Sequence, residues 1–476
     1  MALILNNEVV LRDERHFHPD FLCYRNIPSY RTTFVSPTAF DLLKAWTHPL
    51  TVEEARVLFT DSARTHGESV IGGEFDAFVD QLVSEETLEQ ASVGDYHSEP
   101  LWGLDYSVPN TPVRPMRFPS KINLTLTEGC NLRCLHCLRN ASPEVDTSQD
   151  LTTPELANLF DQFNRGGLIA LAISGGETTV RQDIIDIIDL LHMVRAHTEF
   201  FTNGHRLTPA IRTGLVSLLA RKRRGMHVHV SLDGGTEESH DWLRDRHGSF
   251  RRVLQSVEAL VSDGHLIILE SVLTPRNLDT IPELFEMAKH LGVRGLSLHP
   301  ASFTGRAKVN PVSLKQGDLL VAEQLIQHLA EQYQENFKTE FKWQFFPHPA
   351  NDKTERAFLA SNVSEAGMFH LGLQSDGSVY PCTETIGSDG LTIGNIREQS
   401  LQDIWHSGRW DFYRGGWRLE QLSGCRGCRL DGNCATQACR CYAFSTIGNH
   451  YAPMPECYQS AAELGIGGGP TDVVRV

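Results

Sequence analysis

Three cysteines of the chain are spaced closely enough to hold one metal group. Cys130, Cys134 and Cys137 form a C-x3-C-x2-C triad directly after a segment with the composition of a buried strand. Three thiolates in one loop can bind three irons of a cubane iron–sulfur cluster and leave the fourth iron open to a further ligand. For the triad alone, a zinc ion or scattered buried thiols are equally good interpretations.

A second motif lies one β–α unit further along the chain. Ser174, Gly175, Gly176 and Glu177 follow another strand-like segment. Glycines let the backbone approach a bound molecule closely, and a carboxylate accepts hydrogen bonds from an ammonium group. The spacing between the two motifs favours the iron–sulfur cluster over zinc.

With these motifs, and with seven further cysteines after residue 380, the chain resembles the radical S-adenosylmethionine (SAM) superfamily. Within it, the chain resembles the branch that carries a cysteine-rich SPASM-type C-terminal domain. The resemblance implies a 4Fe–4S cluster on the triad, SAM on its open iron with the Ser-Gly-Gly-Glu motif at the methionyl part, and His136 near the adenine. It also implies a 5′-deoxyadenosyl radical that takes hydrogen from an unactivated carbon.

Polar residues also follow the next two predicted strands. Asn203 comes after the third strand, and Ser231 and Asp233 come at the end of the fourth. Parallel α/β folds bind ligands at the carboxyl ends of their strands. By resemblance, Asn203 and Ser231 contact the ribose or carboxylate of SAM, and Asp233 contacts SAM or the substrate.

The run from His240 to Arg246 is similar to the family's His-Asp-x-x-Arg segment, in which an arginine meets the SAM carboxylate. One extra residue leaves the choice between Arg244 and Arg246 open, and a surface ion-pair network is the alternative for both. The tripeptide at 305–307 (Gly-Arg-Ala) resembles another family feature.

The C-terminal cysteines form a second metal-binding set. Their C-x2-C-x5-C run is typical of an iron–sulfur cluster or zinc, and the resemblance favours iron–sulfur. One auxiliary cluster is then expected on Cys425, Cys428, Cys434 and Cys457.

The other auxiliary site departs from the family pattern, because no cysteine lies between Ser361 and Gly367. We expect Cys382, Cys439 and Cys441 as its ligands. His370, Asp376 or the substrate would fill the fourth position.

Length and composition fit a soluble globular protein of two to four domains. Eleven cysteines without a secretory signal favour a reducing, cytoplasmic location and metal ligation. No apolar run is long enough to span a membrane. A net charge of −16 disfavours nucleic-acid and anionic-membrane partners.

We expect an α/β protein whose strands between 122 and 299 alternate with amphipathic helices. Six β–α units predict a parallel sheet, which the family resemblance specifies as a partial (β/α)6 barrel; periodicity alone would also allow a flat doubly wound sheet. The expected parts are a winged-helix-like domain (1–95), a linker (96–118), the barrel (119–310), a bridging helix and extended segment (311–365), a SPASM-type domain (366–460) and a tail (461–476).

The N-terminal part resembles the peptide-recognition domains of peptide-maturation enzymes, in which a substrate peptide adds a strand to a sheet edge. A DNA-binding winged helix is the rival interpretation. Residues 36–90 contain three Lys/Arg and eleven Asp/Glu, a balance of −8, which is the wrong sign for a phosphate-binding face.

Together these features predict an enzyme that modifies a peptide or small protein. The layout most resembles the quinohemoprotein amine dehydrogenase maturation enzymes, which join cysteine sulfurs to methylene carbons of Asp or Glu. Asp233 and Glu384 are candidates for the base that deprotonates the thiol. A flavodoxin- or ferredoxin-like donor would supply electrons. The alternatives are a carbon–carbon cross-linking maturase, a formylglycine-type maturase and, outside enzymes, a zinc-bound peptide scaffold.

Overall fold

The computed structural model describes residues 2–5, 9–15, 22–26, 31–69, 72–91, 115–222, 225–341, 366–385, 388, 390–414, 416–417, 421 and 440–452. The predicted linker and tail, the extended part of the bridging segment and most of the second cysteine run therefore lie outside the described residues. Within the described part, no helix has both the length and the apolarity needed to cross a membrane.

One large, mostly parallel sheet forms the centre of the molecule, in the order β13-β12-β11-β10-β9-β8-β7-β14-β15-β16. Its first six strands in the chain match the six predicted ones. They are β7 (Lys121–Thr125), β8 (Ala170–Ser174), β9 (His197–Thr202), β10 (Met226–Ser231), β11 (Ile267–Leu273) and β12 (Gly295–Pro300). All five pairings among these strands are parallel.

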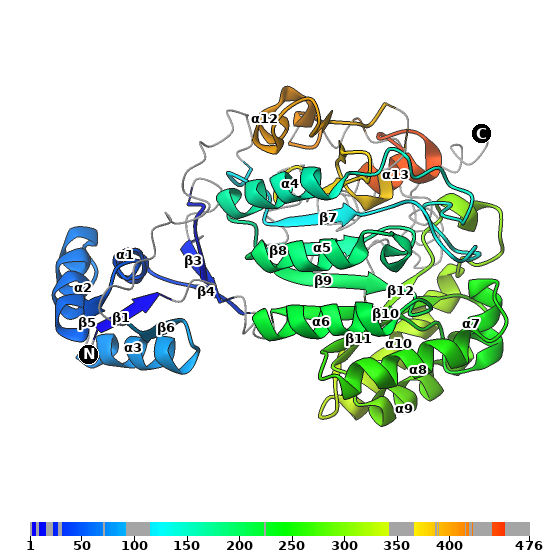
Figure 1. Ribbon diagram of the computed structural model, residues 1–476, viewed down its shortest axis with the longest axis horizontal. Helices are drawn as coiled ribbons and strands as arrows, with labels where there is room; N and C mark the ends of the chain where they lie inside the picture. Colours follow the sequence, from blue (N-terminus) through cyan, green and yellow to red (C-terminus); the bar gives the residue numbers. More distant parts are fainter. Residues whose placement is uncertain are drawn as a thin grey trace.

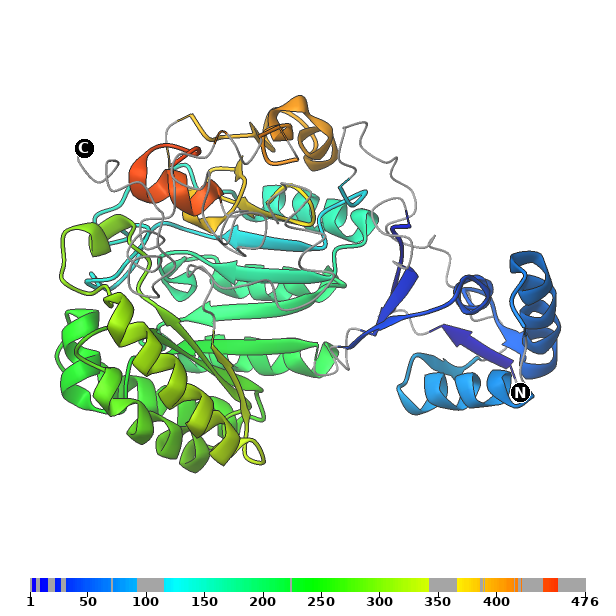
Figure 2. The same cartoon turned by 180° about the vertical axis from the view of Figure 1, so that it is seen from behind.

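Helices cover one face of this sheet (Figure 1). Figure 2 shows the strands from the opposite face. The helices are α4 (Thr153–Gly166), α5 (Ile184–Leu190), α6 (Pro209–Arg221), α7 (Glu237–Arg244), α8 (Ser249–Ser262) and α9 (Ile281–Leu291). Capping residues set where these helices begin and end. In α4, for example, Thr152 and Glu155 form a reciprocal capping box, and Gly167 ends the helix in the left-handed conformation.

The β–α pattern continues past residue 310, where the sequence suggested a bridge between domains. Helix α10 (Gln316–Tyr333) is followed by β13 (Lys338–Phe341), which pairs parallel with β12. At the other edge, β14 (His370–Leu373) pairs parallel with β7, and β15 (Ser378–Tyr380) and β16 (Gly394–Asn395) continue antiparallel. The C-terminal region is therefore joined to the barrel through the sheet itself. Its described helices are α12 (Leu401–His406) and α13 (Arg440–Ile447).

The N-terminal part contains two small antiparallel sheets and three helices. The sheets are β5-β1-β6 and β2-β3-β4. Their strands are β1 (Ala2–Leu5), β2 (Val9–Asp13), β3 (Leu22–Asn26), β4 (Arg31–Phe34), β5 (Leu50–Thr51) and β6 (Leu88–Gln90), and the helices are α1 (Pro37–Ala45), α2 (Val52–His66) and α3 (Glu74–Ser84). Helix α1 starts after Ser36, whose side chain accepts a hydrogen bond from the Ala39 amide.

This module lies at the end of the barrel where the parallel strands begin (Figure 1). Arg12 of β2 is fully buried there and pairs with Glu14. Its guanidinium also donates to the carbonyls of Phe118 (2.8 Å) and Gly167 (2.8 Å), just before β7 and β8. One buried arginine thus connects the module to the barrel.

Candidate functional site

The first three cysteines lie in the loop that follows β7, at the carboxyl end of the sheet. Cys130 and Cys134 are buried and Cys137 is half-buried. Leu132 donates its backbone N–H to the Cys130 sulfur at 3.4 Å, which curls the loop around the sulfur. The triad is not among the compact groups that would suit one metal ion; in the described part of the chain only Glu237, Asp241 and His247 form such a group.

The two glycines after β8 allow the chain to pass directly against the cysteine loop. A Cβ on Gly175 would lie 2.3 Å from the Thr127 carbonyl oxygen, and one on Gly176 would lie 2.2 Å from that of Gly129. The backbone amide of Gly176 donates to Thr127 (2.8 Å). Ser174, the last residue of β8, pairs with the end of β7. Packing against the loop therefore requires both glycines.

Glu177 is buried and ties this turn to the end of β9. Its Oε1 accepts hydrogen bonds from the Thr179 amide (3.1 Å) and hydroxyl (2.6 Å) and from the Thr202 hydroxyl (2.7 Å). Its Oε2 accepts one from the Asn203 amide (2.6 Å). A carboxylate oxygen can accept more than one hydrogen bond. Among the described groups Oε2 has this one donor, so it keeps capacity for a ligand ammonium group.

Arg306, just after β12, holds the cysteine loop from the other side. Its side chain donates to the carbonyls of Cys134 (2.8 Å) and Ala141 (3.0 Å), and its amide donates to Cys137 (2.9 Å). Gly305 has a φ of +54°, and a Cβ there would lie 2.3 Å from the Cys137 carbonyl oxygen. The tripeptide at 305–307 thus fixes the loop's backbone.

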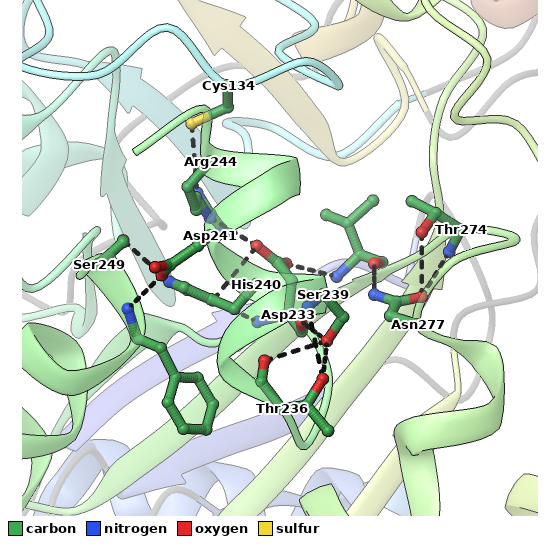
Figure 3. A network of polar contacts seen from close by, with 12 residues as sticks. Cys134, Asp233, Thr236, Ser239, His240, Asp241, Arg244, Ser249, Thr274 and Asn277 are labelled. Atoms are coloured by element: carbon green, nitrogen blue, oxygen red, sulfur yellow. Dashed lines mark hydrogen bonds and ion pairs between the residues drawn. The ribbon is translucent and has the colours of Figure 1, made fainter. Parts of the chain in front are cut away.

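Arg244 at the end of α7 connects the cysteine loop to the end of β10 (Figure 3). Its Nη1 lies 3.8 Å from the Cys134 sulfur, and its Nε donates to Asp233 Oδ2 at 2.5 Å. Arg244 is buried, whereas Arg246 is exposed. Of the two arginines between which the sequence could not choose, Arg244 therefore faces the cysteines and Arg246 faces solvent.

Asp233 is fully enclosed by its partners. Its Oδ1 accepts from the Val272 amide (2.9 Å), and its own amide donates to His240 Nδ1 (3.0 Å). Burial alone would raise the pKa of Asp233, but the charge of Arg244, with His136 and His240 nearby, lowers that pKa to about 2. A carboxylate that stays ionised and paired favours a positioning role over the proton-accepting role suggested by the sequence. The side chain of Glu384, the other candidate base, lies outside the described residues.

The remaining predicted SAM contacts surround the same loop. Asn203 is buried and donates from Nδ2 to Asn131 Oδ1 (2.9 Å), with the Cys130 sulfur at 3.9 Å. Ser231 ends β10 and is half-buried. The Nδ1 atom of His136 is shielded and has no partner among the described groups. Burial, followed by the charge of Arg244, lowers the pKa of His136 to about 3, so this ring is neutral.

The residues of the loop suit an iron–sulfur cluster chemically. Burial raises the pKa of Cys130 to about 12 and also raises that of Cys134. Thiolates at these positions therefore need a cationic partner, which bound iron provides. Cys130, Cys134 and Cys137 would hold the cluster, and Arg244 would offset part of its negative charge.

Only two of the seven C-terminal cysteines lie within the described residues. Cys382 and Cys441 are both buried, and both lie near Tyr413, whose pKa is raised first by burial and then by the two thiols. Asp376 lies in the turn before β15 and caps the Ser378 amide (2.9 Å), so a whole strand separates it from Cys382. This separation disfavours Asp376 as a fourth ligand beside Cys382. The other five lie outside the described residues; these are Cys425, Cys428, Cys434, Cys439 and Cys457.

Three polar side chains on neighbouring strands were not predicted. His229 Nδ1 lies 2.7 Å from Glu270 Oε1, and His299 Nε2 lies 3.6 Å from Glu270 Oε2. The signal was present in the alternation His-Val-His-Val-Ser of β10 and in a glutamate within the mainly apolar β11. Polar residues at every second position of a buried strand indicate a face that is not packed against helices.

Two family profiles match this chain. Residues 124–288 match the radical SAM superfamily, and residues 365–429 match the SPASM iron–sulfur cluster-binding domain. The first covers the cysteine loop and the strands up to α9, and the second begins beside β14.

Three relatives are 26–29% identical to this chain over the aligned residues. An AdoMet-dependent heme synthase of Methanosarcina barkeri is 29% identical over 358 residues, covering 71% of this chain and 96% of that protein. A PqqA peptide cyclase of Ruegeria pomeroyi is 26% identical, covering 70% and 86%. The mycofactocin maturase MftC of Mycobacterium tuberculosis is 27% identical, covering 74% and 85%.

Solved structures share the fold. Streptococcus suis SuiB bound to the precursor peptide SuiA has a TM-score of 0.66 at 15% identity, covering 96% of this chain and all of that one. Native anSMEcpe with bound AdoMet has a TM-score of 0.54 at 17% identity, covering 72% and 95%. The SuiB likeness must include the N-terminal module, because the uncovered 4% is far shorter than that module.

Proposed function

We propose that this protein, which contains a radical SAM domain and a SPASM domain, is an enzyme that modifies a peptide or small protein by radical chemistry. These domains imply a SAM-binding 4Fe–4S cluster and auxiliary clusters. Bound together, cluster and SAM supply a carbon-centred radical that removes a hydrogen atom from an unactivated carbon.

The observation that carries the enzyme assignment is the cysteine loop with its supports. Arg306 and the glycine turn fix the loop's backbone, and Arg244 places a permanent charge beside Cys134. Its pKa is raised because Asp233 and Cys134 outweigh the effect of burial. A zinc-bound scaffold would not need a buried arginine aimed at a cysteine ligand, so the enzyme is the better reading.

A peptide substrate is supported by the N-terminal module. Among the described residues, the outer strands of its two small sheets pair with a strand on one side only, and an extended peptide can add a strand to such an edge. The SuiB structure whose likeness extends over this module was solved with a precursor peptide, and two relatives are named for peptide cyclisation and maturation. We propose that this module binds the substrate peptide.

In finer detail, we propose thioether formation between a cysteine sulfur and a methylene carbon of Asp or Glu. Each cross-link takes a hydrogen atom from the carbon, which leaves in 5′-deoxyadenosine, and a proton from the thiol, which goes to a base. One electron enters from a flavodoxin- or ferredoxin-like donor to split SAM, and one leaves to an auxiliary iron–sulfur cluster. Carbon–carbon cross-linking and formylglycine formation are the alternatives within this class.

A small-molecule substrate is the second candidate. It is favoured by one observation, the match to 96% of an AdoMet-dependent heme synthase. That reading leaves the N-terminal module without a role in substrate binding.

The proposal is tested with the anaerobically reconstituted, reduced enzyme and SAM. We expect 5′-deoxyadenosine to form, and small cysteine-bearing polypeptides co-expressed with the enzyme to lose two hydrogen atoms per cross-link. A thioether removes the cysteine from alkylation and survives reductant, whereas carbon–carbon cross-links leave it alkylatable. Decarboxylation of an added iron porphyrin, with no peptide product, would instead establish the second candidate.

A further inference from the structure

The inner face of the barrel carries a linked group of three ionisable side chains. Glu270 of β11 stands between His229 of β10 and His299 of β12, with one carboxylate oxygen toward each ring. The intervening residues of these strands, such as Val230 and Leu298, are fully buried in the core shared with the helices. Because side chains alternate along a strand, the three polar groups face the opposite, inner side.

Of the two histidines in this group, His299 is accessible to solvent and His229 is buried. The side chain of His299 is 36% exposed, against 10% for His229. Phe201 stacks on the His229 ring at 4.3 Å, and the Nε2 atom of His229 is buried without a partner among the described groups. A substrate entering the barrel would therefore meet His299 and not His229.

Glu270 orients the rings of both histidines. Burial alone would raise the pKa of Glu270, but contacts with His229 and His299 lower it, so the carboxylate is ionised. An ionised carboxylate accepts N–H groups, which assigns a proton to Nδ1 of His229, 2.7 Å from Oε1. Nε2 of His299 lies at ion-pair distance from Oε2 (3.6 Å), so Nδ1 is the ring nitrogen on the side away from the carboxylate. A histidine oriented by a carboxylate is a recurrent form of general base.

His299 also lies beside the predicted SAM site. It pairs in register with Val272, whose amide donates to Asp233 (2.9 Å), and Asp233 in turn holds Arg244 at Cys134. Asp233 itself is enclosed by Arg244 and Val272, which leaves His299 as the accessible carboxylate-backed group here.

We propose that His299 is the catalytic base of the cross-linking step, with Glu270 as its positioning residue and His229 holding Glu270. This inference rests on the proposed function. In the step, the S–H bond of the substrate cysteine breaks, its proton moves to Nδ1 of His299 and the electron pair stays on sulfur. The thiolate then bonds to the carbon from which hydrogen was removed, and the surplus electron would leave to the auxiliary iron–sulfur cluster that the proposed function invokes.

The test uses the reconstituted holoenzyme and a cysteine-bearing polypeptide that the wild type modifies. For His299→Ala we expect cross-linked product to fall about 100-fold or more, while cluster content and 5′-deoxyadenosine formation stay within about twofold of wild type. Free imidazole should restore part of the product in this variant, which a merely structural role would not allow. His227→Asn is the matched control, since this ring lies on the same face of β10 but packs against His197.

For Glu270→Gln, which keeps a hydrogen-bond acceptor and loses the charge, we expect about a tenfold loss of product with 5′-deoxyadenosine again retained. Wild-type product levels in both variants would overturn the inference and leave the proposed function intact. Loss of product in His299→Ala without imidazole rescue would also overturn it. If the wild type cleaves SAM but forms no cross-link with any polypeptide, the proposed function fails, and the inference with it.

Discussion

The two ends of the barrel sheet use charged side chains in different ways. Where the strands begin, Lys121 pairs with Glu199 at 3.1 Å, and Arg12 pairs with Glu14 and with backbone carbonyls. Where the strands end, Arg244 divides its donors between Asp233 and the Cys134 sulfur.

The difference shows which end is built for a ligand. At the starting end, the ion pairs are closed by protein groups, and the contacts of Arg12 join the N-terminal module to the barrel. At the carboxyl end, charged and polar groups surround cysteine sulfurs, and His299 stays accessible. Substitutions at the first end should therefore affect stability, and substitutions at the second should affect the cluster and catalysis.

The largest effect is expected from Gly176→Ala at the carboxyl end. A Cβ there would lie 2.2 Å from the Gly129 carbonyl oxygen and 2.7 Å from that of Glu128, so the cysteine loop must move. We expect loss of the loop's iron, measured by anaerobic iron and sulfide analysis, and no detectable 5′-deoxyadenosine. Gly72→Ala, where a Cβ would meet nothing within 4 Å, is the control and should retain both. Full iron content in Gly176→Ala would contradict the packing described for this turn.

Arg244→Met should be the next most damaging change. It leaves the buried carboxylate of Asp233 without its guanidinium, which costs about 3–5 kcal/mol of unfolding free energy for a buried pair. The exposed neighbour provides the control, since Arg246→Met should shift the urea midpoint by less than the equivalent of about 0.5 kcal/mol.

The double variant Arg244→Met/Asp233→Asn sharpens this prediction. It should regain much of the stability but not the 5′-deoxyadenosine formation, because the charge beside Cys134 is still missing. Recovery of both would show that Arg244 acts only as a structural partner.

At the starting end, Arg12→Met should reduce stability and leave chemistry unchanged. The substitution removes a fully buried guanidinium and its contacts to Glu14, Phe118 and Gly167, at an expected cost of about 3 kcal/mol. The rate of 5′-deoxyadenosine formation per bound cluster should match wild type. Arg15→Met, at a partly exposed pair with Asp13, should cost no more than about 1 kcal/mol. A lower rate per cluster in Arg12→Met would break the contrast between the two ends.

The smallest effect on stability is expected at the surface ion pair between Glu155 of α4 and Arg397 of the C-terminal region. Arg397, together with Thr152, lowers the pKa of Glu155 to about 2. The ionised form is therefore favoured by folding, and its stabilisation is present above the ordinary glutamate pKa of about 4.3 and lost as pH falls toward 2. Denaturant titrations should show wild type more stable than Glu155→Gln by less than about 1 kcal/mol at pH 6. An equal difference at pH 6 and at the lowest accessible pH would contradict this linkage.

The sequence predicted the barrel well because its signals are local. Buried strands alternate with amphipathic helices, and end signals such as the Thr152 capping box mark where helices begin. The segment after residue 310, which the sequence suggested was a bridge between domains, was less predictable. Its strand β13 and the following β14 are short and pair with strands distant in the chain. Strand pairing of that kind depends on tertiary contacts that periodicity does not encode.

The site was predictable where motifs carry it and not where packing decides it. Spacing predicted that Cys130 and Glu177 lie at the same end of the sheet, but which of Arg244 and Arg246 faces the cysteines depends on the end of α7, where Arg244 turns inward. The enclosure of Asp233 and the exposure of His299 are also tertiary properties. Neither can be read from residue type, which is why the sequence pointed to Asp233 as the base and the structure is needed to propose His299.

The most direct test of the central claim is anaerobic iron and sulfide quantification of wild type and of a variant with Cys130, Cys134 and Cys137 all replaced by alanine. We predict that the variant loses about four irons per chain, keeps the iron of the C-terminal clusters and forms no 5′-deoxyadenosine from SAM. A wild-type protein that carries zinc and little iron after reconstitution, and never cleaves SAM, would contradict the radical SAM account.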